Sequence, residues 1–194
     1  MKPELTGEAL VQLVHRYYPA GLENYDPRYK ESEEAQRLRA LLETHVGGTP
    51  AWKDFIQRLE REFADCSIWD STIPRHDPCY SVRVSNPGFV TGDLVFDKVV
   101  GLVSTLAPVY AIYASHTDKA SLPERKSWLR FPPFPPRLQP HEAKLAGLIE
   151  STFGYTRLPN DILFIPVPDL VPRTVNYRLG EGLLIDCLFT EHRW

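Results

Sequence analysis

The stretch VVGLVSTLAPVYAIYASHT, residues 99–117, is the longest run of this chain without a charged side chain. The run is long enough to cross a bilayer as a helix. Its proline near the middle, Pro108, and its many β-branched and aromatic residues favour two buried strands instead. We therefore expect strands at 99–106 and 109–115, at the centre of a sheet whose two faces are covered by helices.

Three amphipathic helices are expected before this stretch. Apolar residues recur at helical spacing between Thr6 and Tyr17, between Ser32 and Val46, and between Thr49 and Phe63. Each segment begins with Ser or Thr at a capping position, and a Gly-Gly pair ends the second one. Residues 1–65 are therefore predicted to be the helical part of the chain.

From residue 66 onward the apolar pattern changes to that of strands. The short segment 161–167 fits either a helical turn or a strand. The sequence predicts a single α+β domain, with N-terminal helices followed by a mostly antiparallel sheet and one further helix. The elements expected in the sheet-forming part, residues 66–194, are strands at 67–73 and 80–85, a turn at 86–88, a proline-rich irregular loop at 117–140, a helix from Pro140 to Gly154, and a terminal hairpin of 175–179 and 183–189.

The net charge and the cysteine content limit which partners and which cellular compartment we expect. The formal net charge of −3 lacks the basic excess of a nucleic-acid binder, and we expect neither a nucleic-acid nor a membrane partner. Three widely spaced cysteines, Cys66, Cys79 and Cys187, indicate a reducing compartment. The first residues lead into an amphipathic helix and not into an apolar signal core. A cytoplasmic location is therefore expected.

The segment His76–Cys79 holds the densest group of reactive side chains. A thiolate nucleophile needs a base and an orienting group, and His, Asp and Cys are all present. A small apolar role for Cys79 at the start of a strand is the simpler interpretation.

Near the end of the chain, Asp186, Cys187 and His192 are a second group of reactive side chains. Asp186 and Cys187 are adjacent, so on a strand their side chains would point to opposite faces and the three residues could not form one site. We expect Cys187 in the core and Asp186 in solvent.

No local pattern in the sequence indicates a metal or cofactor site. The six histidines never occur as HxH or HxxxH, although ligands can still converge by folding. The Gly180-Glu181-Gly182 sequence lacks the spacing of a phosphate loop and is typical of a hairpin turn. We therefore assign no catalytic residue, no metal ligand and no cofactor.

Two aromatic segments are candidates for contact with a partner. In the first, residues 67–72, an edge strand would turn Trp69 or Asp70 outward, and an acid beside a tryptophan suits a basic partner. Core placement of Trp69 is the favoured alternative. The second is RFPPFPPR, residues 130–137, which either contacts a partner or packs back onto the sheet. Aromatic and arginine side chains are enriched at binding hot spots, and the candidates here are Trp128, Arg130, Phe131 and Phe134.

Four features of the layout suggest a family. They are the helical start, WDST at 69–72, VSTLAPVYAIY at 103–113 and GEGLLIDCLFTEHRW at 180–194. In these features the chain resembles the small cytoplasmic immunity proteins encoded beside bacterial polymorphic toxins. The resemblance implies a non-enzymatic protein that binds a cognate toxin domain and blocks its active site or its folding. The alternatives are a cysteine-dependent hydrolase or transferase using the His76–Cys79 region, and a structural or assembly protein that could form a homo-oligomer.

Overall fold

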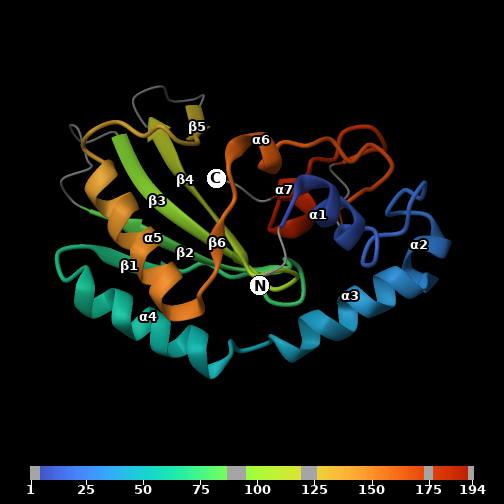
Figure 1. The fold of residues 1–194 in the computed structure, drawn as a ribbon, viewed down its shortest axis with the longest axis horizontal. Coiled ribbons are helices and arrows are strands. Elements are labelled where there is room, and N and C mark those ends of the chain that lie inside the picture. The colour runs from blue at the N-terminus through green and yellow to red at the C-terminus, as the bar shows by residue number, and fades with distance from the viewer. Residues whose placement is uncertain (1–4, 87–94, 119–125, 173–176, 192–194) are drawn as a thin grey trace.

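The computed structural model describes residues 5–86, 95–118, 126–172 and 177–191, with the backbone alone at 95–97, 117–118 and 126–128. An antiparallel sheet lies between groups of helices (Figure 1). This arrangement confirms the α+β class with a mostly antiparallel sheet that the sequence predicts.

The N-terminal helices begin at the capping residues that the sequence indicates. The side-chain oxygens of Thr6, Ser32 and Thr49 each accept a hydrogen bond from the backbone N–H three residues further on. A short helix that the apolar pattern does not predict lies between the first two, and Asp26 caps it. The four helices are α1 (Gly7–Val14), α2 (Pro27–Glu31), α3 (Glu33–Thr44) and α4 (Pro50–Glu62).

The uncharged run forms two adjacent antiparallel strands. Val99 pairs with Ala114, and Val103 pairs with Tyr110. In the described part of the chain, no helix is both long and apolar enough to cross a membrane. The strands follow the order β1-β2-β3-β4-β5, and β6 pairs in parallel with β4. Their bounds are β1 (Ser67–Asp70), β2 (Cys79–Ser85), β3 (Val95–Ser104), β4 (Val109–Asp118), β5 (Lys126–Arg130) and β6 (Thr156–Arg157).

The predicted irregular loop at 117–140 was partly wrong. Strand β4 continues to Asp118, and β5 pairs with its last residues, so ladder hydrogen bonds extend the sheet into this segment. The helix predicted after it is present as α5 (Gln139–Phe153), and Gly154 ends it with a left-handed φ of 66°. The ambiguous segment that follows contains a helical turn, α6 (Asn160–Leu163).

The predicted terminal hairpin was also wrong for the described residues. The segment is helical, α7 (Leu184–Leu188), and residues 177–179 form no strand. The expectation that Asp186 lies in solvent fails for the same reason. Its carboxylate is buried, where it accepts hydrogen bonds from the N–H of Leu183 at 2.9 Å and from the hydroxyl of Tyr177 at 3.2 Å. A buried acceptor that caps a first turn favours a helix over a strand.

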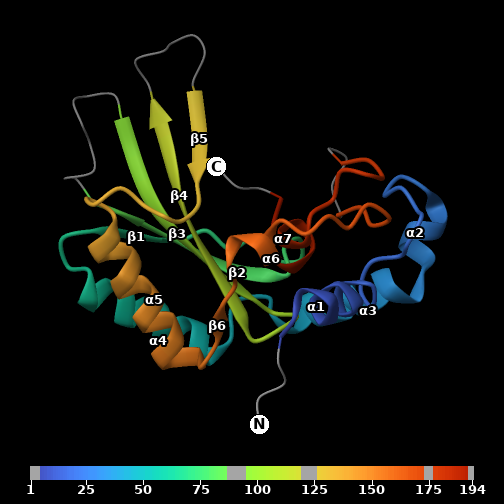
Figure 2. The same ribbon diagram turned by 45° about the horizontal axis from the view of Figure 1, so that its top comes forward.

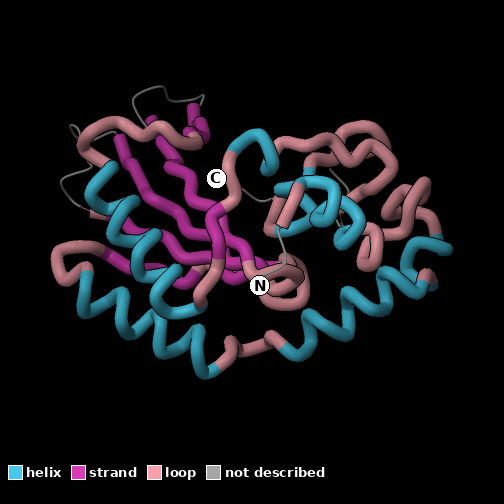
Figure 3. Tube along the Cα trace, in the orientation of Figure 1, coloured by secondary structure: helices cyan, strands magenta, loops and turns pink. Residues whose placement is uncertain are grey.

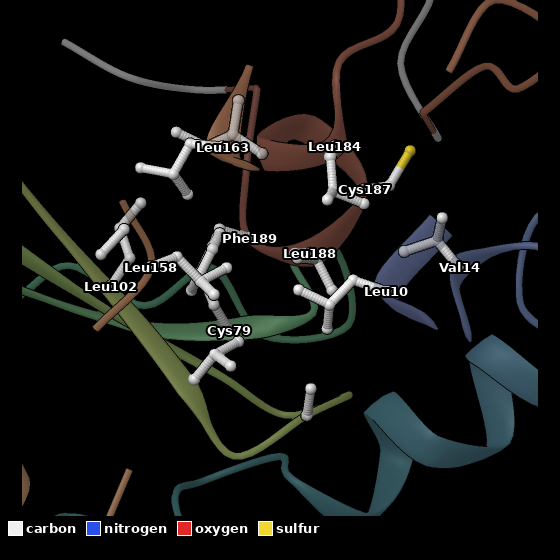
Figure 4. Close-up of a cluster of buried hydrophobic side chains, with 14 of the residues drawn as sticks. Leu10, Val14, Cys79, Leu102, Leu158, Leu163, Leu184, Cys187, Leu188 and Phe189 are labelled. Carbon is white, nitrogen blue, oxygen red and sulfur yellow. The ribbon is translucent and has the colours of Figure 1, made fainter. Parts of the chain in front are cut away.

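The sheet separates two hydrophobic cores, because the side chains of a strand alternate between its faces. Figures 2 and 3 show α4 and α5 together on one side, and α1, α6 and α7 gathered on the other. Figure 4 shows part of the core beneath α1 and α7. Along β4, Val109, Ala111 and Tyr113 face that core, whereas Tyr110, Ile112 and Ala114 face the core beneath α4 and α5.

Candidate functional site

Strand β1 lies at one end of the strand order and pairs with β2 alone. Trp69 is 62% exposed there, so its expected core placement was wrong. Neighbouring side chains on a strand point to opposite faces, and Ile68 takes the face that packs against the α4–α5 core. The indole of Trp69 instead contacts the guanidinium of Arg83, whose central carbon lies 5.2 Å from the ring centroid. This cation–π contact holds a large aromatic surface at the edge of the sheet.

Asp70 follows on the other face of the strand and is also exposed. Its Oδ2 accepts a hydrogen bond from the indole N–H of Trp52 at 2.9 Å. Its Oδ1 accepts a second hydrogen bond from the backbone N–H of Thr72 at 3.1 Å. The carboxylate is therefore held in one orientation while it remains accessible.

Asp70 lines a cavity of about 260 Å³ between strands β1 and β2 and the connection from α3 to α4. Two buried rings form part of its lining: Trp52 and Tyr80 stack with their centroids 4.7 Å apart and their planes inclined by 13°. His45 meets Tyr80 edge-on, with 5.7 Å between the ring centroids. The lining residues are His45, Gly47, Gly48, Trp52, Asp70, Thr72, Pro74 and Tyr80, of which Gly47, Asp70 and Pro74 are exposed.

The glycine pair that ends α3 also shapes this cavity. Gly47 and Gly48 have φ values of +78° and +74°, a conformation that residues with a side chain rarely adopt. A Cβ at Gly48 would lie 3.2 Å from Cδ1 of Trp52. The glycine pair that ends the helix, as the sequence predicts, therefore also lets the backbone pass close to the Trp52 ring in the cavity lining.

The polar groups of the cavity favour a cationic ligand. Nδ1 of His45 lies 2.9 Å from the carbonyl oxygen of Leu41, so with the proton on Nδ1 the other ring nitrogen is an acceptor. The Tyr80 hydroxyl oxygen accepts a hydrogen bond from the N–H of Thr49 at 3.2 Å. A fixed and accessible carboxylate such as Asp70 attracts ammonium and guanidinium groups. We use the name edge site for the surface along β1 that presents Asp70 and this cavity on one face of the strand and Trp69 on the other.

The second aromatic segment lies at the other end of the strand order. Phe134 is 6% exposed and belongs to the α4–α5 core. Phe131 packs against Tyr113 and Phe164, with ring centroids 5.8 Å and 4.9 Å away. Arg130 is exposed, and the side chain of Trp128 lies outside the described residues. The structure thus does not bring the second segment together with Trp69 and Asp70.

The His76–Cys79 segment does not present a thiolate. Cys79 is buried, and burial raises the pKa of its thiol well above the ordinary value, with the negative charges of Asp77 and Glu191 adding to the effect. Nδ1 of His76 lies 3.0 Å from Oδ1 of Asp77. Cys187 is buried as predicted, and burial likewise raises the pKa of its thiol. His192 lies outside the described residues.

The sequence offers Trp69 and Asp70 as candidates for partner contact, but it does not indicate the cavity residues Trp52 and Tyr80. Trp52 and Tyr80 belong to an apolar helix stripe and an alternating strand, which are patterns typical of core residues. Only the fold brings them beside Asp70, so no local signal marks them.

No protein-family model matches the chain, and no curated protein or solved structure matches it at a significant level.

Proposed function

We propose that this protein is a non-enzymatic binding protein, an immunity protein that neutralises a cognate bacterial toxin domain through the edge site. The proposal rests on one observation: hydrogen bonds fix the orientation of the Asp70 carboxylate at the mouth of an aromatic-lined cavity. Asp70 lies on the edge strand β1, and the same strand also exposes Trp69. Tryptophan is among the residues most enriched at binding hot spots.

The geometry of the site favours a basic side chain of the partner as its ligand. A lysine or arginine can place its charge at Asp70 and its methylene groups in the adjoining cavity. Because hydrogen bonds already fix Asp70, binding costs little side-chain entropy at this residue. Trp69 projects from the opposite face of β1, where it would contact the partner beside Arg83 and not the group bound at Asp70.

Co-expression with toxin domains encoded beside its gene tests the proposal. The unaltered protein should relieve the growth arrest caused by one of them. The double variant Trp69→Ala/Asp70→Asn should lose this relief, because it removes an exposed anchor and a charge without emptying the core. Arg130→Ala, a change of an exposed residue at the other end of the strand order, is the matched control and should still protect.

Protein levels must be equal in all strains, as judged by immunoblot of the soluble fraction. Persistent arrest with every neighbouring toxin domain would contradict the proposed function. If the double variant relieves growth arrest as well as the unaltered protein does, the immunity function would stand, but the edge site would not be the surface that binds the toxin domain.

A further inference from the structure

Three side chains of metal-ligand type converge on the side of the sheet opposite the α4–α5 core. His76 and Asp77 come from the turn before β2, and Glu191 follows α7. One ligand atom from each residue lies within 4.8 Å of the others. The side chain of Asp77 is 3% exposed and that of His76 is 35% exposed, so the group is largely buried but accessible from one side.

The turn that carries His76 and Asp77 is fixed from both ends. Arg75 adopts a left-handed conformation with a φ of 64°, which is uncommon outside glycine. The N–H groups of the two residues after it both donate to the carbonyl oxygen of Ile73, at 3.3 Å and 3.2 Å. The carbonyl oxygen of Pro78 accepts a hydrogen bond from the N–H of Thr105 at 2.9 Å. Residues in sparsely populated regions of φ/ψ space, such as Arg75, occur more often at functional sites than elsewhere in proteins.

Packing of the C-terminal helix supplies the third group. Leu188 and Phe189 are fully buried in the same core as Cys79, and Figure 4 labels all three. The hydroxyl of Ser104 donates to the carbonyl oxygen of Leu188 at 3.0 Å. This anchoring brings Glu191 to residues more than half the chain away in sequence.

The geometry points to a binding site for a divalent first-row transition cation, held by His76, Asp77 and Glu191. One imidazole with two carboxylates is a ligand set of the kind that binds zinc and similar cations. Two ligands of a tetrahedral zinc stand about 3.3 Å apart, since zinc–ligand distances are about 2.0–2.2 Å. His76 Nδ1 and Asp77 Oδ1 are hydrogen-bonded at 3.0 Å, and a cation that replaced the shared proton would require them to move apart by only about 0.3 Å. Side-chain rotation of Glu191 would complete the set.

The electrostatic surroundings favour a cation at the same place. The carboxylates of Asp77 and Glu191 bring two negative charges within 4.8 Å of each other, and the side chain of Asp77 is 3% exposed. Little water is therefore available to screen the charge of Asp77 from that of Glu191. A bound divalent cation would offset the repulsion between them.

A second group, Asp65, Cys66 and His141, has the same ligand spacing and provides the control. It contains a thiol, and Asp65 is exposed, so it differs in chemistry and in burial. Asn86 already donates hydrogen bonds to Oδ2 of Asp65 at 3.0 Å and to Sγ of Cys66 at 3.3 Å. His76 and Asp77 also share a hydrogen bond, so the thiol of Cys66 and the exposure of Asp65 are what distinguish the second group.

The test is zinc binding by the full chain, measured by calorimetry and by metal analysis after dialysis. We expect about one zinc per chain. Glu191→Gln and His76→Ala should each weaken binding by more than about tenfold, because even outer-shell substitutions can cost that much. Cys66→Ser should bind like the unaltered protein. Circular dichroism checks that each variant is folded, and Glu191→Gln keeps the shape of the side chain.

Cobalt(II) gives an independent readout of the ligand type. A cobalt complex without a thiolate charge-transfer band supports the site at His76, Asp77 and Glu191. A thiolate band that disappears in Cys66→Ser overturns the assignment in favour of the second group. Absence of zinc binding, or unchanged binding by both Glu191→Gln and His76→Ala, also overturns it.

Discussion

The indole N–H of Trp52 donates a hydrogen bond to Oδ2 of Asp70 across 2.9 Å and so joins helix α4 to the edge strand β1. Trp52 is almost fully buried, whereas Asp70 is exposed. The carboxylate therefore has two separable roles, as the acceptor for a buried donor and as a charge at the surface.

These two roles predict different effects of two substitutions at Asp70. Asp70→Ala leaves the Trp52 N–H without its acceptor and should lower the free energy of unfolding by about 1–3 kcal/mol. Asp70→Asn can still accept the bond and should lower it by less than about 1 kcal/mol. Urea denaturation followed by tryptophan fluorescence measures both. Equal losses would show that the hydrogen bond contributes nothing to stability.

Gly101 on β3 is predicted to set the distance between the sheet and α5. A Cβ at this position would lie 3.2 Å from Cδ2 of Leu145 and 3.3 Å from Cδ1 of Ile149. Gly101→Ala should therefore cost about 1–3 kcal/mol of stability through overpacking. Gly147→Ala is the control, since a Cβ there meets no atom within 4 Å and alanine is the better helix former. That variant should gain about 0.5–1 kcal/mol, and a similar loss in both variants would contradict the account.

The pair His15–Asp169 predicts a pH dependence of stability. Burial alone would lower the pKa of His15, but its hydrogen bonds with the carbonyl of Val11 and with Asp169 raise it above the ordinary value of 6.5. The contribution of the pair is therefore fully present below pH 6.5 and is lost as the pH rises through the folded-state pKa. Since both side chains are partly exposed, it should be below about 1 kcal/mol.

Urea denaturation of the unaltered protein and of Asp169→Asn checks this prediction. The difference in unfolding free energy should be larger at about pH 5.5 than at about pH 8.5. A difference that grows as the pH rises would reverse the sign of the predicted effect.

The burial of Phe134 predicts a structural role for this ring. Phe134→Ala should lower the free energy of unfolding by about 3–5 kcal/mol, because it opens a cavity in the α4–α5 core. Arg130→Ala, at an exposed residue four positions earlier, should change it by less than about 0.5 kcal/mol. Thermal denaturation of the two variants makes the comparison, and a small effect of Phe134→Ala would show that the ring does not support the core.

Local patterns were sufficient for the elements whose chemistry is local. Thr6, Ser32 and Thr49 cap the helices that they predict, and the run around Pro108 forms the two central strands. The C-terminal segment was misassigned because its apolar residues flank the turn-like Gly180-Glu181-Gly182 sequence, as in a hairpin. The burial of Asp186, which accepts hydrogen bonds from the N–H of Leu183 and the hydroxyl of Tyr177, depends on tertiary structure.

The candidate site could be predicted only in part for the same reason. Asp70 is visible in the sequence as an acid beside Trp69, but its contacts with Trp52 and with the cavity at Tyr80 form only when α4 packs beside β1. His76 and Asp77 are adjacent in sequence, whereas Glu191 reaches them only through the burial of α7.

Recognition through the edge site is tested by hydrogen–deuterium exchange of the protein, with and without the toxin domain whose growth arrest it relieves. Binding should slow exchange in residues 45–49 and in strand β1 with the residues that follow it, because these segments form the edge site. Little change is expected in residues 130–137. Protection confined to residues 130–137, with none at β1 or at the Gly47-Gly48 connection, would contradict recognition through Trp69 and Asp70.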